Sequence, residues 1–240
     1  MDRITIVGMG PIGASIGLAL RRVGLEDTEV VGADGDRRKL ARASKMGAVD
    51  NATGNLRSAL KGAQLVVLDV PFTDIRETLE AIGPALEDGC VVTDTGRVKA
   101  PVIRWARDHL PPSPGFVGGR PLPARTIATL EQADAGLFDG THYCVVADEA
   151  TEPEAVRNVV GMVETLGARP LFMSAEEHDS YSAALAQLPR LLSTALVGAA
   201  AESPTWQDMH RLAVPEFAEM TRPAAGDPSE ASAESAANAD

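Results

Sequence analysis

A glycine-rich turn near the start of the chain constrains its fold more than any other feature. Residues 8–13 read Gly-Met-Gly-Pro-Ile-Gly, directly after the apolar run Ile4–Gly8 and directly before a helical pattern. In this context Gly8 permits a tight turn, Gly10 lets the backbone approach a pyrophosphate, and Gly13 allows a helix to pack closely on a strand. The start of the helix then presents free N–H groups and its positive dipole end to the phosphates. The pattern predicts a dinucleotide-binding strand–turn–helix unit.

Short apolar runs alternate with helical patterns through the first two-thirds of the chain. After the turn, apolar residues recur at helical spacing from Ile12 to Val23, and Gly24 follows as a natural stop. Several runs are continuously apolar, as strands covered on both faces should be. The expected strands are Ile4–Gly8, Val30–Ala33, Leu65–Val70, Cys90–Asp94, Phe116–Gly118, Tyr143–Ala147 and Leu171–Met173. This repetition predicts an α/β fold with a Rossmann-type, doubly wound and mostly parallel sheet.

The last third of the chain changes character, and we predict three regions. Residues 1–173 form the dinucleotide-binding domain, and residues 174–228 form a short, truncated helical domain for substrate binding and dimerisation. The second region begins with Ser174 and Glu177 at capping-box spacing, followed by a leucine-rich helix to about Ala201. That helix is apolar enough to be buried in a second domain or against a partner subunit, and we predict a homodimer. Residues 229–240 lack large apolar side chains and are predicted to be a disordered acidic tail.

Asp34 ends the second expected strand, at the spacing where an acidic residue binds the ribose diol of the adenosine. A carboxylate there repels a 2′-phosphate, so NAD is favoured over NADP, although the basic run Arg37–Lys39 keeps NADP open. The strand end at Val70 and Pro71 belongs to the same edge of the sheet. The predicted cofactor-binding residues are Gly8, Gly10, Pro11, Ile12, Gly13, Asp34, Val70 and Pro71.

Composition excludes several classes of partner. The chain has 240 residues, with 22 Lys and Arg against 34 Asp and Glu, for a net charge of −12. That balance disfavours nucleic acid and anionic membrane surfaces, and no apolar run has the length of a transmembrane helix. Cys90 and Cys144 lie in expected strands and are predicted to be buried, reduced thiols rather than a disulfide or metal pair. With no apparent signal peptide, we expect a cytoplasmic protein.

Three basic side chains follow strands of the predicted sheet. Arg97, Lys99 and Arg120 lie at the carboxyl ends of strands, where the reacting part of a ligand binds in such folds. They predict a basic pocket for a small substrate with carboxylates, although any one of them could instead be a surface residue on a loop.

Taken together, these segments resemble the prephenate/arogenate dehydrogenase family of tyrosine biosynthesis. The resemblance covers about residues 3–228 in family order. It rests on the segments 6–13, 68–71, 92–99, 116–121, 137–140, 177–179, 188–189 and 219–222. It implies a Rossmann domain followed by a helical domain that makes a dimer. It also implies NAD(P)-dependent oxidative decarboxylation, in which a hydride and carbon dioxide leave and the ring becomes aromatic.

The resemblance also implies that the family's catalytic positions have changed in this chain. The family's histidine that takes the hydroxyl proton corresponds to Arg120, and the serine beside the hydroxyl corresponds to Arg97. A guanidinium has no acceptor, so Arg120 cannot be a general base. Lys99 matches a family lysine and could orient the nicotinamide or the substrate, or bind only its own loop.

Four further positions come from the helical region. Two histidines of the family correspond to Gln187 and Arg190, which we take as substrate-binding candidates. His178 is the matched histidine that remains, and Arg222 matches an arginine that holds a substrate carboxylate. His178 could also serve only to hydrogen-bond the backbone near its helix start.

Three functions are consistent with this sequence. The first is an active dehydrogenase for a cyclohexadienyl acid, in which the arginines form a re-tooled anion site. The second is a non-catalytic NAD-binding pseudoenzyme or regulatory protein, since four motif residues have changed together. The third is a dehydrogenase for another hydroxy or imino acid, which rests on fold analogy alone.

Overall fold

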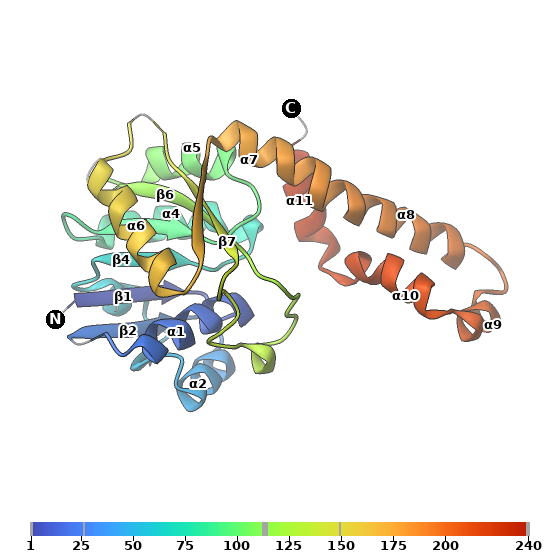
Figure 1. Cartoon of the computed structure of the whole chain (residues 1–240), viewed down its shortest axis with the longest axis horizontal. Helices are drawn as coiled ribbons and strands as arrows, with labels where there is room; N and C mark the ends of the chain where they lie inside the picture. The colour runs from blue at the N-terminus through green and yellow to red at the C-terminus, as the bar shows by residue number, and fades with distance from the viewer. Residues whose placement is uncertain (1, 26, 112–114, 149, 239–240) are drawn as a thin grey trace. The chain divides into compact units, whose positions relative to one another are not determined.

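The computed structural model describes residues 2–25, 27–111, 115–148 and 150–238. It divides into two compact units, Met1–His178 and Asp179–Asp240 (Figure 1). Our predicted boundary after residue 173 falls at the end of the last strand. The compact first unit instead continues into the following helix as far as His178.

The first unit is an eight-stranded sheet in the order β3-β2-β1-β4-β5-β6-β7-β8. The strands are β1 (Asp2–Val7), β2 (Thr28–Ala33), β3 (Asn51–Thr53), β4 (Leu65–Leu68), β5 (Val91–Asp94), β6 (Phe116–Leu122), β7 (His142–Val146) and β8 (Arg169–Met173). β3 to β6 form one parallel run, β7 pairs antiparallel with β6, and β8 pairs parallel with β7. The order reverses direction between β1 and β4, which confirms the doubly wound, mostly parallel sheet.

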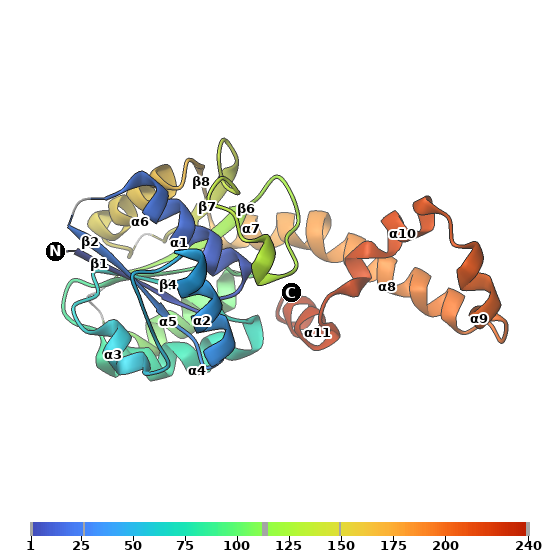
Figure 2. The same cartoon turned by 90° about the horizontal axis from the view of Figure 1, so that it is seen from below.

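Helices cover both faces of this sheet. They are α1 (Pro11–Val23), α2 (Arg37–Met46), α3 (Leu56–Leu60), α4 (Phe72–Ile82), α5 (Ala100–His109) and α6 (Pro153–Thr165). α1 and α6 lie together on one face, and α4 and α5 lie together on the other (Figure 2). β4 and β5 are buried along their whole length because helices cover them on both sides. This explains why their apolar runs are continuous rather than alternating.

α1 shows how the local sequence produces its element. Ile16, Ala19 and Leu20 are buried in the core against the sheet, as the apolar stripe predicts. Val23 ends the stripe in a more exposed position. Gly24 then adopts the left-handed conformation with φ = 66° and stops the helix. Full burial of the Ile16 and Leu20 side chains contributes about 1.5–3 kcal/mol each.

All seven expected strands are present, with shifted ends, but β3 is missing from the prediction. Its residues, Asn-Ala-Thr, are short and polar and lie at the edge of the sheet. An edge strand of this kind has little apolar side-chain pattern to reveal it, and backbone pairing with β2 defines it.

The second unit consists of helices. They are the remainder of α7 (Ala175–Ser182), a π-helical segment (Ala183–Gln187), α8 (Leu188–Ala201), α9 (Trp206–Met209), α10 (Pro215–Thr221) and α11 (Pro228–Ala237). The capping box predicted at the start of α7 is present. The Ser174 N–H donates to Glu177 Oε2 and the Glu177 N–H donates to Ser174 Oγ, both at 3.1 Å.

The predicted disordered tail is wrong over residues 229–238, because α11 occupies most of this segment. Asp227 caps the helix by accepting the Ser229 N–H at 2.8 Å, and Pro228 occupies the first turn. Glu234 is 2% exposed and pairs with Arg190 of α8. The segment is therefore held by polar contacts, which a search for apolar residues does not detect. Residues 239 and 240 of the predicted tail lie outside the described residues.

The continuous helix Ala175–Ala201 is long and apolar enough to cross a membrane by length and composition alone. This differs from our expectation that no segment has that capacity. Only 11% of the most apolar 18-residue stretch of this helix is buried. Leu185 and Leu192 are 80% and 63% exposed.

Both cysteines are free and buried, as predicted, with Cys90 directly before β5 and Cys144 in β7. Burial raises the pKa of the Cys90 thiol to about 12 and also raises the pKa of Cys144. We expect the folded protein to resist Ellman's reagent at roughly pH 8, because the thiolate is the reactive form. Unfolding in urea should release both thiols for reaction. Stoichiometric labelling of either thiol before unfolding would contradict this arrangement.

Candidate active site

The turn between β1 and α1 leaves no room for side chains at two of its glycines. Gly8 has φ = +98°, and a Cβ there would lie 2.0 Å from the carbonyl oxygen of Asp69. A Cβ on Gly13 would lie 2.3 Å from the carbonyl oxygen of Gly8. These contacts account for glycine at both positions, as the motif predicts.

The start of α1 is the place where an anionic ligand would be expected. The helix begins at Pro11 with Gly10 as its N-cap, and Asp69 Oδ2 accepts the Gly13 N–H of its first turn at 2.7 Å. Pro11 has no N–H group to leave unpaired, so its position in the first turn has no cost. Ile12 follows in the same turn. A Cβ on Gly10 would lie 3.2 Å from Asp69 Oδ2, so a larger residue at this position would crowd the carboxyl group beside the helix end.

Asp34 lies against the glycine-rich turn. Its Oδ2 accepts the Met9 N–H at 2.8 Å, and its Oδ1 accepts the Asp36 N–H at 2.7 Å. Lys39 approaches Oδ2 at 3.8 Å. The carboxylate is thus held by backbone donors at the end of β2, beside the turn that would receive a pyrophosphate.

A cavity of about 340 Å³ opens at this carboxyl edge of the sheet. Val70 and Pro71 line it, together with Asp34 and Gly8, so four of the predicted cofactor residues share one space. Its other lining residues are Val7, Ala33, Gly35, Lys39, Gly54, Leu56, Asp69, Asp74 and Thr78. The residues fit a dinucleotide, since Gly8 of the glycine-rich turn and the Asp34 carboxylate line the cavity, and α1 begins three residues after Gly8.

Asp69 is a residue of this cavity to which the sequence analysis assigned no role. Its Oδ2 accepts the Gly13 N–H and its Oδ1 accepts the Thr95 hydroxyl, both at 2.7 Å. Burial raises the pKa of this carboxyl, against the lowering effect of these two hydrogen bonds. The sequence does contain a hint of this residue, because in Leu-Asp-Val-Pro an acidic side chain directly follows an apolar strand.

Lys99 and Asp94 form a buried ion pair, and both side chains are fully buried. The Asp94 carboxylate also accepts the Gly96 N–H and the Gly119 N–H, each at 3.0 Å. The pair therefore ties the loop after β5 to β6. Lys99 is placed as a structural cation, and its role in contacting substrate or nicotinamide stays a prediction.

Arg120 and His178 lie together, although they are far apart in the sequence. Nη1 of the half-buried Arg120 is 3.4 Å from Nε2 of His178, which is 2% exposed. Arg120 pairs with Cys144 across β6 and β7. Positive charge from Arg120 and Lys99 lowers the pKa of the Cys144 thiol against the larger effect of burial, so both cations lie near it. Arg97 is exposed on the loop after β5.

In the second unit, Gln187 and Arg190 face α11. The Arg190 guanidinium pairs with Glu234, and Gln187 Nε2 donates to the Glu234 carbonyl oxygen at 3.4 Å. Asn238 donates to Gln187 Oε1 at 3.2 Å. The two predicted substrate-binding residues are thus engaged within their own unit, whereas Arg222 is exposed.

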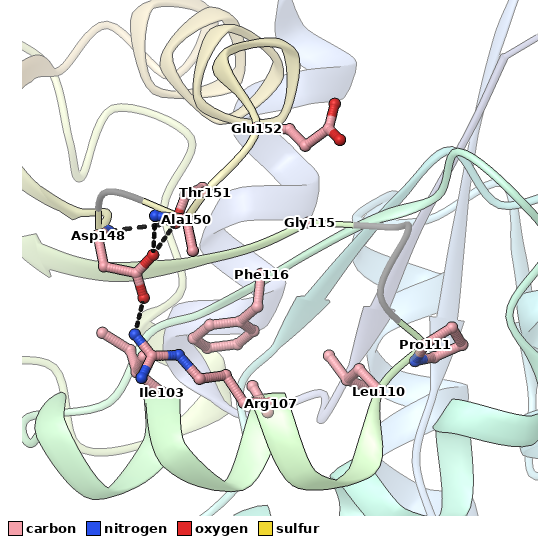
Figure 3. Close-up of a pocket in the computed structure, with 11 residues that line it drawn as sticks. Ile103, Arg107, Leu110, Pro111, Gly115, Phe116, Asp148, Ala150, Thr151 and Glu152 are labelled. Carbon is pink, nitrogen blue, oxygen red and sulfur yellow. Dashed lines mark hydrogen bonds and ion pairs between the residues drawn. The ribbon is translucent and has the colours of Figure 1, made fainter.

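A second cavity, of about 270 Å³, lies between α5, the start of β6 and the segment before α6 (Figure 3). Arg107 pairs with Asp148 at its wall, and Phe116 lines it. Phe116 begins β6, so this cavity is at the amino edge of the parallel strands. Ligands of doubly wound sheets bind at the carboxyl edge, and no predicted site residue lines this space.

Comparison with known proteins identifies the family. The family model for the prephenate dehydrogenase nucleotide-binding domain matches residues 16–171, and the model for the prephenate dehydrogenase dimerization domain matches residues 174–240. The chain belongs to the prephenate dehydrogenase family. Two curated relatives extend the match. The chain is 27% identical to Bacillus subtilis prephenate dehydrogenase over 95% of its own length, and 31% identical to Zymomonas mobilis cyclohexadienyl dehydrogenase over 94%.

The chain spans 62% of the Bacillus protein and 77% of the Zymomonas protein. Solved structures agree with the fold. Prephenate dehydrogenase from A. aeolicus, in complex with hydroxyphenyl propionate and NAD+, aligns with a TM-score of 0.90 and 25% identity. That alignment covers 100% of this chain and 83% of the other. Synechocystis arogenate dehydrogenase aligns with a TM-score of 0.79 and 28% identity, covering 99% and 84%.

The buried ion pair gives a test of the site's architecture. We expect Lys99→Met to lower the free energy of unfolding by about 3–5 kcal/mol, because it leaves the Asp94 carboxylate buried and unpaired. Urea denaturation measures this loss. The exposed pair Arg125–Asp134 provides the control, and Arg125→Met should change stability by less than about 1 kcal/mol. Equal effects of the two substitutions would contradict the structural role of Lys99.

Proposed function

We propose that this chain binds NAD at the cavity beside α1 and catalyses the oxidative decarboxylation of a cyclohexadienyl acid, prephenate or arogenate. The observation that carries the proposal is the β1–α1 turn, where a Cβ on Gly8 would lie 2.0 Å from the Asp69 carbonyl oxygen. Such a turn accepts glycine alone and brings the start of α1 to the sheet edge, in a chain of the prephenate dehydrogenase family. When bound, the nicotinamide supplies the hydride acceptor.

NAD is the preferred cofactor in this proposal. Gly8, Gly10 and Gly13 let the backbone approach the pyrophosphate, and Pro11 and Ile12 begin the helix that faces it. Asp34 is held by two backbone N–H groups with its carboxylate at the cavity. A carboxylate held in this place accepts ribose hydroxyls and repels a 2′-phosphate.

His178 is the proton acceptor that we propose for the substrate hydroxyl. The guanidinium of Arg120 has donors and no acceptor. The facing Nε2 of His178 must therefore be an acceptor, which leaves the ring proton on Nδ1. Arg120 is the more exposed partner of the two, and we assign it to bind a substrate carboxylate. In doing so its guanidinium would leave Nε2, and the lone pair of that nitrogen would then accept the hydroxyl proton.

A second function has its own supporting observation. Lys99 is paired with Asp94, and Arg190 is paired with Glu234, so carboxylates of the chain itself neutralise two cations predicted for the substrate. This arrangement favours a protein that binds NAD without turning over a cyclohexadienyl acid. Turnover separates the two functions.

The decisive assay follows NADH formation by purified protein with NAD and prephenate, and then with arogenate. We expect turnover with one of these acids, and His178→Gln should lower kcat by about 10²–10⁴-fold, as for the loss of a general base. The dissociation constant for NAD should not change in that variant. Asp34→Arg is the cofactor control, and it should weaken NAD binding and abolish turnover with NAD.

No turnover with either acid, together with NAD binding that Asp34→Arg weakens, would favour the non-catalytic function. Full activity in His178→Gln would refute the role of the imidazole while leaving the dehydrogenase assignment in place.

We further propose a homodimer that forms through the helical unit. The matched family model is described as a dimerization domain, and the unit exposes Leu185, Leu188, Leu191 and Leu192. We expect Leu192→Glu to give a monomer in sedimentation at micromolar concentration, because it places a charge in the apolar face. Val23→Glu, at an exposed position of α1 in the first unit, is the control and should remain dimeric. A monomeric wild-type protein would contradict the proposal. The cytoplasmic location stays a prediction.

A further inference from the structure

The carboxyl group of Asp69 lies where the proposed cofactor needs positive potential. Its Oδ2 accepts the Gly13 N–H at 2.7 Å, which is one of the backbone donors in the first turn of α1. The same oxygen lies 3.2 Å from the position that a Cβ on Gly10 would take. An acidic side chain of the protein therefore occupies part of the helix end that favours a bound phosphate.

Asp69 is held in this position from both sides. Thr95, after β5, donates its hydroxyl to Oδ1 at 2.7 Å, and the backbone N–H of Asp69 donates to the Val7 carbonyl oxygen at 2.7 Å. The side chain is therefore fixed between α1 and β5. A dinucleotide that enters the cavity must accommodate this carboxyl group, since it cannot turn away without losing both side-chain contacts.

We propose that Asp69 couples NAD binding to proton uptake, so that the protein binds NAD with Asp69 in its neutral, protonated form. The proposal rests on the proposed cofactor site. Two anionic groups at one helix end repel each other, and a proton on the carboxyl removes the repulsion. A protonated carboxyl still accepts a hydrogen bond from Gly13 and exchanges its contact with Thr95, whose hydroxyl can donate or accept.

The charged groups around Asp69 reinforce this coupling. Asp34, at the end of β2, raises the pKa of Asp69, and Lys39 of α2 lowers it, while burial has the largest effect and raises it. Asp74 of α4 lines the same cavity. Behind the site, from β7 and β5, are Tyr143 and the internally neutralised Asp94–Lys99 pair. Three carboxyl groups, those of Asp34, Asp69 and Asp74, thus line the cavity with one cation, Lys39.

The sign of the effect follows from linkage. A group that binds a proton more tightly in the complex than in the free protein makes ligand binding stronger as pH falls. Affinity for NAD should fall about tenfold for each pH unit between the pKa of Asp69 in the free protein and its pKa in the complex. Outside that interval the affinity should be flat.

The test measures NAD binding by isothermal titration calorimetry, in buffers of equal pH and different ionisation enthalpy. The wild-type protein should take up a proton on binding, and its dissociation constant should rise with pH. Asp69→Asn, which copies the neutral form, should bind without proton uptake and with a flat pH profile. At the upper end of the pH range it should bind at least about tenfold more tightly than wild type. Asp69→Ala should be equally flat.

Asp108→Asn is the matched control, because it makes the same substitution at an exposed position of α5 that does not line the cavity. It should keep the proton uptake and the pH dependence of the wild type. A flat wild-type profile with no proton uptake would overturn the role of Asp69 and leave the NAD site intact. Weaker binding by Asp69→Asn would also overturn it, because the carboxylate would then be a direct ligand. Absence of NAD binding in all of these proteins would overturn both this inference and the proposed function.

Discussion

The rest of the structure depends on one backbone contact, where the turn after β1 passes the end of β4. The Gly8 N–H donates to the Ala33 carbonyl oxygen at 2.8 Å, and the Asp69 N–H donates to the Val7 carbonyl oxygen at 2.7 Å. The turn is thereby held between the ends of β2 and β4, where the strand order reverses. No side chain fits at Gly8, so α1 starts directly at the sheet edge. The cavity, the carboxylates of Asp34 and Asp69 in it, and the helix end all follow from this contact.

Two largely buried ion pairs connect separate elements of this acidic protein. Asp94 and Lys99 join the loop after β5 to β6, and Glu234 and Arg190 join α11 to α8. Because a buried charge is costly without a partner, each pair stabilises its connection only while both members remain. Cations that the sequence suggested for a substrate therefore serve the fold. Arg120 lies beside an imidazole, that of His178.

The parts of the structure that were predictable depend on local patterns. The glycine-rich turn, the buried strands and the stripe on α1 follow from backbone sterics and hydrophobic periodicity, which a single segment of sequence displays. The contact of Arg120 with His178 and the position of Asp69 beside Gly13 join distant segments, so no local pattern contains them. β3 and α11 were not predicted, because backbone pairing with β2 defines β3 and polar contacts hold α11. For α11 the absence of large apolar residues pointed to disorder, whereas Asp227 and Glu234 supply the cap and the ion pair.

The most direct test of the central claim is a crystal structure of this protein grown with NAD. The account predicts the pyrophosphate at the start of α1, beside Gly10 and Ile12, with the adenosine ribose on Asp34. It also predicts the nicotinamide toward the ends of β5 and β6, on the side of Arg120 and His178. A dinucleotide bound elsewhere, such as the cavity lined by Phe116 and Arg107, would contradict the account, as would a helix end filled by the Asp69 carboxylate alone.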